Sequence, residues 1–131
     1  MPTVRFGVSL EKKLLESLDT FTQKNNFPNR SQAIRHLINE YIVDEKWDSN
    51  QEVAGSISIT YDHHKRNLLN KLNSIQHNYH DVILSNLHFH IDHNNCMEII
   101  AVKGKAGVLR ELSEKIITVK GIQYGKLTMT H

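Results

Sequence analysis

The chain has 131 residues, enough for one domain or two small ones, and 39% of them are apolar, which allows a modest core. Its 16 basic and 14 acidic side chains give a net charge of only +2, so overall charge gives no sign of nucleic-acid binding. Its apolar runs are too short to span a membrane, the first residues lack a signal-peptide pattern, and a single cysteine excludes an intrachain disulfide. We therefore expect a soluble, cytoplasmic protein that needs no membrane and has a free thiol.

Residues 3–10 alternate between apolar and polar side chains, which predicts a short strand. The polar side of this strand carries Arg5, Gly7 and Ser9. Apolar residues then recur at helical spacing over residues 14–21, and Ser9 stands where the N-cap of that helix is expected. Ser31 is the expected N-cap of a second helix, whose apolar face runs over residues 33–42.

One strand and two helices in about forty residues cannot bury much surface alone, and the strand has no partner within this segment. Pairing with the same strand of a second copy produces a two-stranded antiparallel ribbon over four helices. Such a ribbon fits the major groove of double-stranded DNA. We therefore expect residues 1–46 to form a dimeric DNA-binding domain.

The motif Asn-Arg-Ser-Gln-Ala-Ile-Arg at residues 29–35, together with the elements before it, resembles the ribbon-helix-helix repressors. The resemblance implies a βαα domain whose strand presents Arg5, Gly7 and Ser9 to the DNA bases. It also implies that a DNA phosphate is gripped at the start of the second helix, by Asn29, Arg30 and Ser31; free N–H groups and the helix dipole favour an anion there. The best-known members have a threonine where this chain has Gly7, so we expect a different operator sequence or a weaker readout of the base at that step.

Residues 47–51 lose periodicity and become polar, which predicts a linker, and we expect Trp47 to pack against one of the domains rather than to bind a ligand. Residues 52–131 then predict strand, helix, two strands, helix and strand. This βαββαβ order is typical of a ferredoxin-like domain, and the fold class is therefore α+β. Two helices on one face of a four-stranded sheet leave the other face open, and oligomerisation is the simplest way to cover it.

The stretch from His77 to Glu98 holds five of the nine histidines and the only cysteine. His88 and His90 are two residues apart in a predicted strand and therefore point to the same side. If residues 91–95 connect a hairpin with Cys96 opposite His90, one thiol and two imidazoles crowd together. These donors predict a transition-metal site, and the spacing alone leaves zinc, copper and nickel open.

The whole chain resembles the nickel-responsive repressors of the NikR family. The resemblance rests on the domain order, on Gln-His-x-x-His-Asp from residue 76 and on Leu-His-x-His-Ile-x-His-x-x-Cys-x-Glu-Ile from residue 87. It implies an ACT-like C-terminal domain that forms a homotetramer, a dimer of dimers, and binds one Ni(II) per chain. It also implies a planar site made by His88, His90 and Cys96 of one chain and by His77 of a neighbour.

The same resemblance implies that Tyr61, Gln76 and Glu98 orient the ligands, and that Lys65 and Arg66 touch DNA phosphates. Nickel binding is expected to order the helix that leads into the fourth ligand. It would favour an arrangement in which the two DNA-binding dimers reach two half-sites together, because nickel must bind that arrangement more tightly than the others to shift the equilibrium.

Two carboxylates that help to hold an interdomain cation in some members are replaced here by Gln32 and His36, which puts that cation site in doubt. Four further histidines are expected mostly as surface residues, with weaker secondary metal sites as the alternative. These are His63, His64, His80 and His93.

Four other functions compete with a nickel-responsive repressor. A ribbon-helix-helix regulator with another metal or a small-molecule effector keeps both domains. A metal-buffer protein would not need a base-reading ribbon. A DNA-binding partner of a toxin usually continues into a disordered tail, whereas residues 52–131 predict a folded domain. An enzyme is the least favoured, because no residue pattern resembles an activated nucleophile with its orienting partner.

Overall fold

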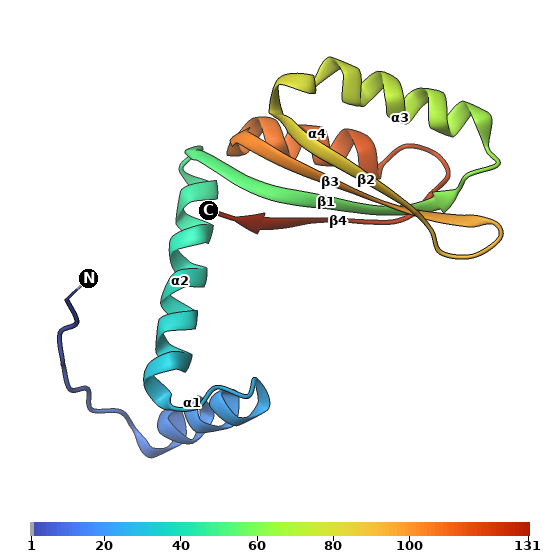
Figure 1. Ribbon diagram of the computed structural model, residues 1–131. Coiled ribbons are helices and arrows are strands. Elements are labelled where there is room, and N and C mark those ends of the chain that lie inside the picture. Colours follow the sequence, from blue (N-terminus) through green and yellow to red (C-terminus); the bar gives the residue numbers. More distant parts are fainter. Residues whose placement is uncertain (1) are drawn as a thin grey trace. The chain divides into compact units, whose positions relative to one another are not determined.

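The computed structural model describes residues 2–131, and their helices and strands fall into two units, one ending at Tyr41 and one starting at Ile42. Figure 1 shows the elements in chain order. Among the described residues, no helix is both long and apolar enough to cross a bilayer.

The N-terminal unit contains α1 (Lys12–Lys24) and the first part of α2 (Arg30–Asp48). The two helices are joined by a bidentate ion pair, in which Arg30 Nε lies 2.8 Å from Asp19 Oδ1 and Nη2 lies 3.0 Å from Oδ2. The pair lowers the pKa of the Asp19 carboxyl, chiefly through its hydrogen bond with Arg30. A stack of Phe21, Phe27 and His36 adds apolar contact between the helices.

Both predicted N-caps of this unit are wrong. Ser9 lies in the extended segment before α1, and Glu11 precedes the helix without a capping hydrogen bond from its side chain. Helix α2 begins one residue before Ser31, and Asn29 caps it by accepting a 2.9 Å hydrogen bond from the Gln32 N–H. Asparagine caps as well as serine does, because its short side chain reaches the third N–H of the helix.

Residues 2–10 are extended but form no strand, although the alternation predicts one for residues 3–10. A strand requires a hydrogen-bonded partner, and the described part of this single chain supplies none for these residues. The apolar side chains of the segment are uncovered: Val4 is 87% exposed and Phe6 is 74% exposed. The pattern that predicts a strand is therefore present, but the described residues of one chain do not pair with it.

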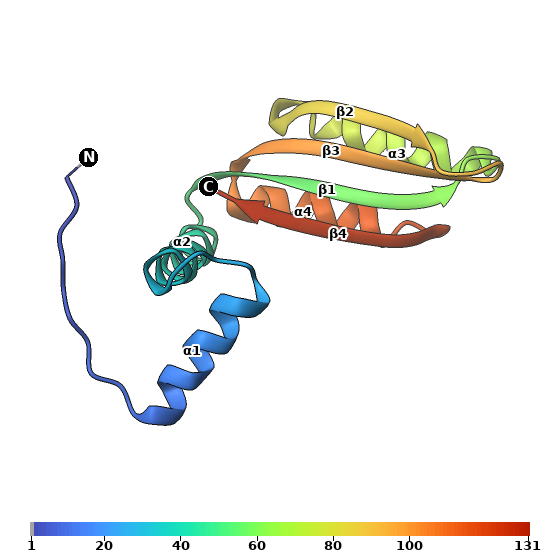
Figure 2. The ribbon, with the colours of Figure 1, turned by 60° about the horizontal axis from the view of Figure 1, so that its bottom comes forward.

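The C-terminal unit has the predicted βαββαβ order. Its elements are β1 (Glu52–Asp62), α3 (Arg66–Asn78), β2 (Ile83–His90), β3 (Asn95–Lys105), α4 (Ala106–Ile117) and β4 (Ile122–Thr130), with a short 3-10 turn at His80–Val82. The antiparallel sheet has the order β2-β3-β1-β4, and both helices cover the same face (Figure 2). The strand order is that of a ferredoxin-like fold.

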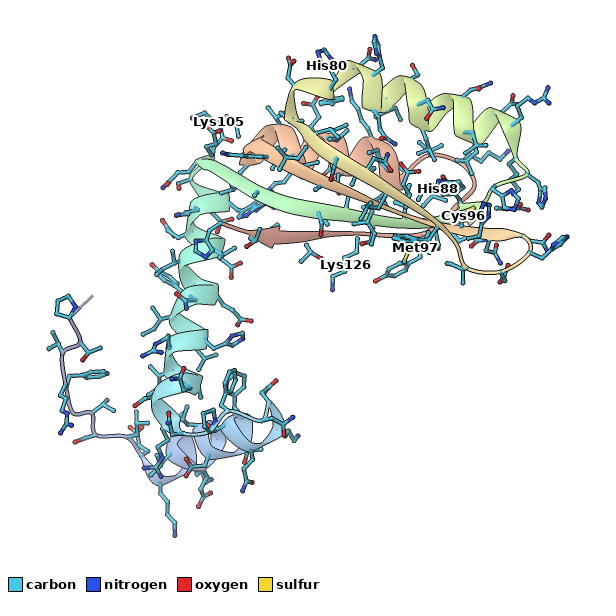
Figure 3. The ribbon with its side chains drawn as sticks, in the orientation of Figure 1. His80, His88, Cys96, Met97, Lys105 and Lys126 are labelled. Atoms are coloured by element: carbon cyan, nitrogen blue, oxygen red, sulfur yellow. The ribbon has the colours of Figure 1, made fainter. Side chains whose placement is uncertain are left out.

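The core lies between this face and the two helices. Alternate residues of β1 and β3, such as Ile57, Ile59 and Ile100, are buried there with Leu109 and Leu112 of α4. The other face of the sheet is uncovered, and Figure 3 shows Met97 and Lys126 on that side. Large apolar residues exposed on this face include Leu87, Phe89 and Tyr124.

Helix α2 continues through Trp47 and Asp48, which the sequence analysis places in the linker 47–51. The indole of Trp47 is only 2% exposed, and its Nε1–H donates a 2.9 Å hydrogen bond to the Thr130 carbonyl. Asn50 then accepts a 2.7 Å hydrogen bond from the Gly107 N–H at the start of α4. Trp47 thus packs against a domain, as predicted, and this packing explains why the helix extends beyond its predicted end.

Candidate metal centre

The β2–β3 hairpin has the predicted register, with His90 opposite Cys96. Asp92 shapes the turn, because its Oδ1 accepts 2.9 Å hydrogen bonds from the N–H groups of Asn94 and Asn95. These backbone hydrogen bonds, of which the one from Asn95 has the largest effect, hold the pKa of the Asp92 carboxyl below its ordinary value. The turn therefore fixes the two strand ends that carry a thiol and an imidazole.

The thiol of Cys96 is buried, and its Sγ lies 3.5 Å from Nδ1 of His90. A third donor comes from the end of β1, because His63 offers a ring nitrogen within 4.8 Å of the donor atoms of both other residues. From the sequence, His63 is predicted to be a surface residue, with a weaker secondary metal site as the alternative. Only the pairing of β1 with β3, which sets Asp62 opposite Asn95, brings it to this corner, and no short-range pattern encodes that pairing.

His88 lies on the same side of β2 as His90, and the two ring centroids are 5.6 Å apart. The Tyr61 hydroxyl donates its proton to Glu98 Oε1 over 2.8 Å, because a carboxylate can only accept. The Tyr61 oxygen, 3.3 Å from His88 Nδ1, therefore accepts a hydrogen bond from the N–H at that position. This arrangement leaves Nε2 of His88 with its lone pair free for a metal.

Glu98 is 5% exposed and is the centre of a hydrogen-bond network that joins three strands and α3. Besides Tyr61, Gln76 donates from Nε2 to Glu98 Oε2 over 2.8 Å. Asn86 of β2, which the sequence analysis does not single out, donates to the same oxygen. Burial, and then the neighbouring carboxylate, raise the pKa of the Tyr61 hydroxyl, so it remains protonated and keeps its place in the network.

His77 is exposed in the last turn of α3, where its ring centroid lies 6.0 Å from that of His80. Figure 3 shows His80 well apart from His88 and Cys96. One chain thus brings together three of the four predicted ligands and leaves His77 facing solvent. Among the described residues, the group of donors close enough to share an ion consists of His63, His90 and Cys96, and it contains neither His77 nor His88.

The donor set fits a transition metal of the nickel, copper or zinc type, because a thiolate and imidazoles are ligands for these ions. Burial raises the pKa of the Cys96 thiol, and the nearby carboxylates of Asp62, Glu98 and Asp92 raise it further. The thiol therefore holds its proton at neutral pH until a cation displaces it.

The residues predicted to meet DNA are exposed within their own units. The space beside Gly7 is open, with nothing within 4 Å of the position that a Cβ would take. Arg30 is already paired with Asp19, and Asn29 is used as a cap, so the phosphate grip predicted there depends on Ser31 and backbone N–H groups. In the other unit, Lys65 and Arg66 are exposed at the start of α3.

His36, at one of the two positions noted for an interdomain cation, packs against Phe27 with the two rings tilted at 42° and their centroids 5.2 Å apart. Its Nε2 lies 3.1 Å from Glu40 Oε1. This side chain is thus engaged within its own helix and with the loop that precedes it.

A helix pair with an unpaired extended segment, followed by a ferredoxin-like domain with a cysteine and histidine corner, defines a class: metal-responsive regulators with a ribbon-helix-helix domain. Comparisons with known proteins agree. Residues 4–45 match the family described as ribbon-helix-helix protein, copG family. Residues 54–130 match the NikR C-terminal nickel-binding domain.

Relatives match over nearly the full length and carry the name "Putative nickel-responsive regulator". The protein of Syntrophus aciditrophicus is 49% identical over 97% of this chain and 93% of its own length. That of Thermococcus onnurineus is 44% identical over 99% of this chain and 95% of its own. The chain belongs to the NikR family of nickel-responsive transcriptional regulators, which is not an enzyme family.

Among solved structures, an uncharacterized protein from Thermotoga maritima aligns with a TM-score of 0.56. It is 16% identical, and the alignment covers 62% of this chain and all of that one. At this identity the likeness concerns the fold alone.

Proposed function

We propose that this protein is a cytoplasmic repressor whose C-terminal domain binds one Ni(II) per chain and thereby promotes binding of the N-terminal domain to a double-stranded DNA operator. The observation that carries the proposal is the corner where Cys96 meets His90, with His88 beside it held by Tyr61. A buried thiol facing imidazoles with free lone pairs has the donors that Ni(II) accepts.

Cys96, His88 and His90 of one chain would hold the nickel together with His77 of a neighbouring chain. The exposure of His77, and its absence from the donor group of its own chain, support a role across an interface. The open face of the sheet supports the same assembly, since an apolar surface of this kind is covered in a stable protein. We propose a homotetramer built as a dimer of dimers, with residues 52–131 as its core.

The N-terminal segment supports DNA binding through a second copy. Alternate apolar side chains of residues 2–10 are uncovered in one chain, and pairing two such segments buries them in a ribbon. Arg5, Gly7 and Ser9 would then face the bases of the major groove, with residues 1–46 as the DNA-binding domain. The start of α2, near Ser31, would bind a phosphate, and Lys65 and Arg66 would add contacts to the DNA backbone.

Metal binding and DNA binding are coupled through His77, which belongs to one chain and binds the metal of another. His77 ends α3, and Gln76 beside it is tied to the buried Glu98. When His77 engages the hairpin of a neighbour, the last turn of α3 is fixed between two chains. The metal then stabilises those arrangements of the tetramer in which this contact is made, and the DNA-binding dimers are held at one spacing.

The test is a titration of metal-free protein with Ni(II), followed by absorption spectroscopy and then by operator binding with and without metal. We expect a thiolate-to-nickel charge-transfer band that saturates at one metal per chain. A Cys96→Ser variant should lack the band and the nickel-dependent DNA binding. A parent protein without the band, or a variant that behaves like the parent, would contradict the proposal.

A second candidate is a regulator that responds to another transition metal, and the position of His63 favours it. His63, His90 and Cys96 of one chain already offer three donors close together, and a water molecule as the fourth ligand would complete a tetrahedral zinc site. A His63→Ala variant separates the two candidates. If His63→Ala leaves nickel binding and the metal-dependent DNA binding unchanged, the shared four-ligand site is supported. If His63→Ala abolishes the metal-dependent DNA binding while His77→Ala leaves it unchanged, the site within one chain is supported.

A further inference from the structure

Asn86 lies in the middle of β2, two residues before His88 and on the same side of the strand. Asparagine is disfavoured in strands, so its presence there points to a role for the side chain. Its Nδ2 donates a 2.6 Å hydrogen bond to Gln76 Oε1 and a second one to Glu98 Oε2. Each of the two amide protons therefore has its own acceptor.

These contacts close a ring of three residues. Gln76 donates to Glu98 Oε2 over 2.8 Å and accepts from Asn86, while Asn86 donates to both partners. A buried carboxylate needs donors to replace the water it has lost, and the ring gives one oxygen of Glu98 two of them. In this ring, Asn86 is the member that ties β2 to α3.

We propose that Asn86 is a positioning residue that fixes the last turn of α3 on the β2–β3 hairpin before metal arrives. The inference rests on the proposed function, because Gln76 immediately precedes His77, and Tyr61 joins Glu98 to His88. The ring therefore sets where a chain presents His77 to its neighbour relative to its own three ligands. Metal affinity depends on this positioning, since ligands that are already in place lose less freedom on binding.

The chemistry of the side chain explains why an amide suits this position. An alanine would leave Gln76 Oε1 without its donor and one oxygen of Glu98 with a single donor. An aspartate of nearly the same shape would bring a second negative charge against Glu98 and provide no proton to donate. A serine keeps one donor and can replace only one of the two contacts.

The test uses Asn86→Ala and Asn86→Asp in the full-length protein. Ser85→Ala is the matched control, because Ser85 is the neighbouring residue on the other side of β2, opposite Ala101. Amide hydrogen exchange of residues 73–79 is measured in metal-free protein, and Ni(II) affinity is measured by competition with a chelator. We expect faster exchange in that segment and about 10- to 100-fold weaker nickel binding in both variants, with the control like the parent.

Exchange and affinity equal to those of the parent in both variants would overturn the inference. If Asn86→Ala does not fold, Asn86→Ser is measured in the same way. Faster exchange and weaker nickel binding in Asn86→Ser then support the inference, and parent-like values of both overturn it. The two proposals fail separately. A parent without a nickel–thiolate band contradicts the proposed function, while exchange in the metal-free variants still shows whether Asn86 holds α3.

Discussion

The two units of the chain differ in how much of their structure one copy can complete. The C-terminal unit buries a continuous core, in which Ile57, Ile59, Ile100 and Leu112 are fully inaccessible. The N-terminal unit leaves Phe6 and its apolar neighbours in the extended segment exposed. The C-terminal unit is therefore a domain with one uncovered face, whereas the apolar side chains of the N-terminal extended segment are not buried within one chain. The difference indicates that, in the proposed assembly, a second copy completes the DNA-binding half, while the metal-binding half has its own core before assembly.

The largest expected effect is on stability: removing a large apolar side chain should destabilise the two units in different ways. Leu112→Ala should lower the free energy of unfolding of the C-terminal unit by about 2–5 kcal/mol, because it leaves a cavity in a closed core. Phe6→Ala should act through dimerisation instead, so its cost should shrink as protein concentration rises. Urea denaturation followed by circular dichroism at two concentrations measures both. Equal destabilisation by Phe6→Ala at every concentration would break the comparison.

Acid should weaken the function of the metal-binding half through the Cys96 thiol. Burial, and then nearby carboxylates, raise the pKa of this thiol, so Ni(II) must displace its proton. Lowering the pH makes that proton harder to remove, and nickel affinity should fall about tenfold per pH unit for each proton displaced. Chelator competition between pH 6 and pH 8 measures the slope. A pH-independent affinity would mean that the thiolate is not a ligand.

A smaller effect tests whether the end of α2 belongs to the C-terminal unit. Trp47→Phe keeps most of the buried ring and removes the 2.9 Å hydrogen bond to Thr130. The C-terminal unit should lose about 1 kcal/mol of unfolding free energy, the usual contribution of one hydrogen bond. Thermal unfolding followed by circular dichroism measures this loss. A matched Tyr41→Phe variant, altered at an exposed aromatic of the same helix, should unfold like the parent.

The sequence predicts the elements of the C-terminal unit because each element buries one face. Apolar residues therefore recur with a period of two residues in its strands and 3.6 residues in its helices. The pairing of His90 with Cys96 is predictable for the same reason, since a short turn fixes the register of its hairpin. Asn86 escapes prediction, and His63 is predicted only as a surface residue or a weaker secondary metal site, because their partners lie far away in sequence, on strands or helices that meet only in the fold. The ribbon strand is predictable as a pattern but is absent from the structure, because the described residues of one chain offer this segment no strand to pair with; the proposed assembly supplies one from a second copy.

The most direct test of the account is subunit complementation. His77→Ala and Cys96→Ser should each bind nickel poorly. The first removes the ligand that a chain supplies to the site of its neighbour, and the second removes a ligand of the chain's own hairpin. When the two variants are mixed, unfolded and refolded together, about a quarter of the sites should combine an intact hairpin with an intact His77 from another chain. The account predicts that the nickel–thiolate band returns at about that level. A mixture with no more band than the separate variants would contradict a site shared between chains.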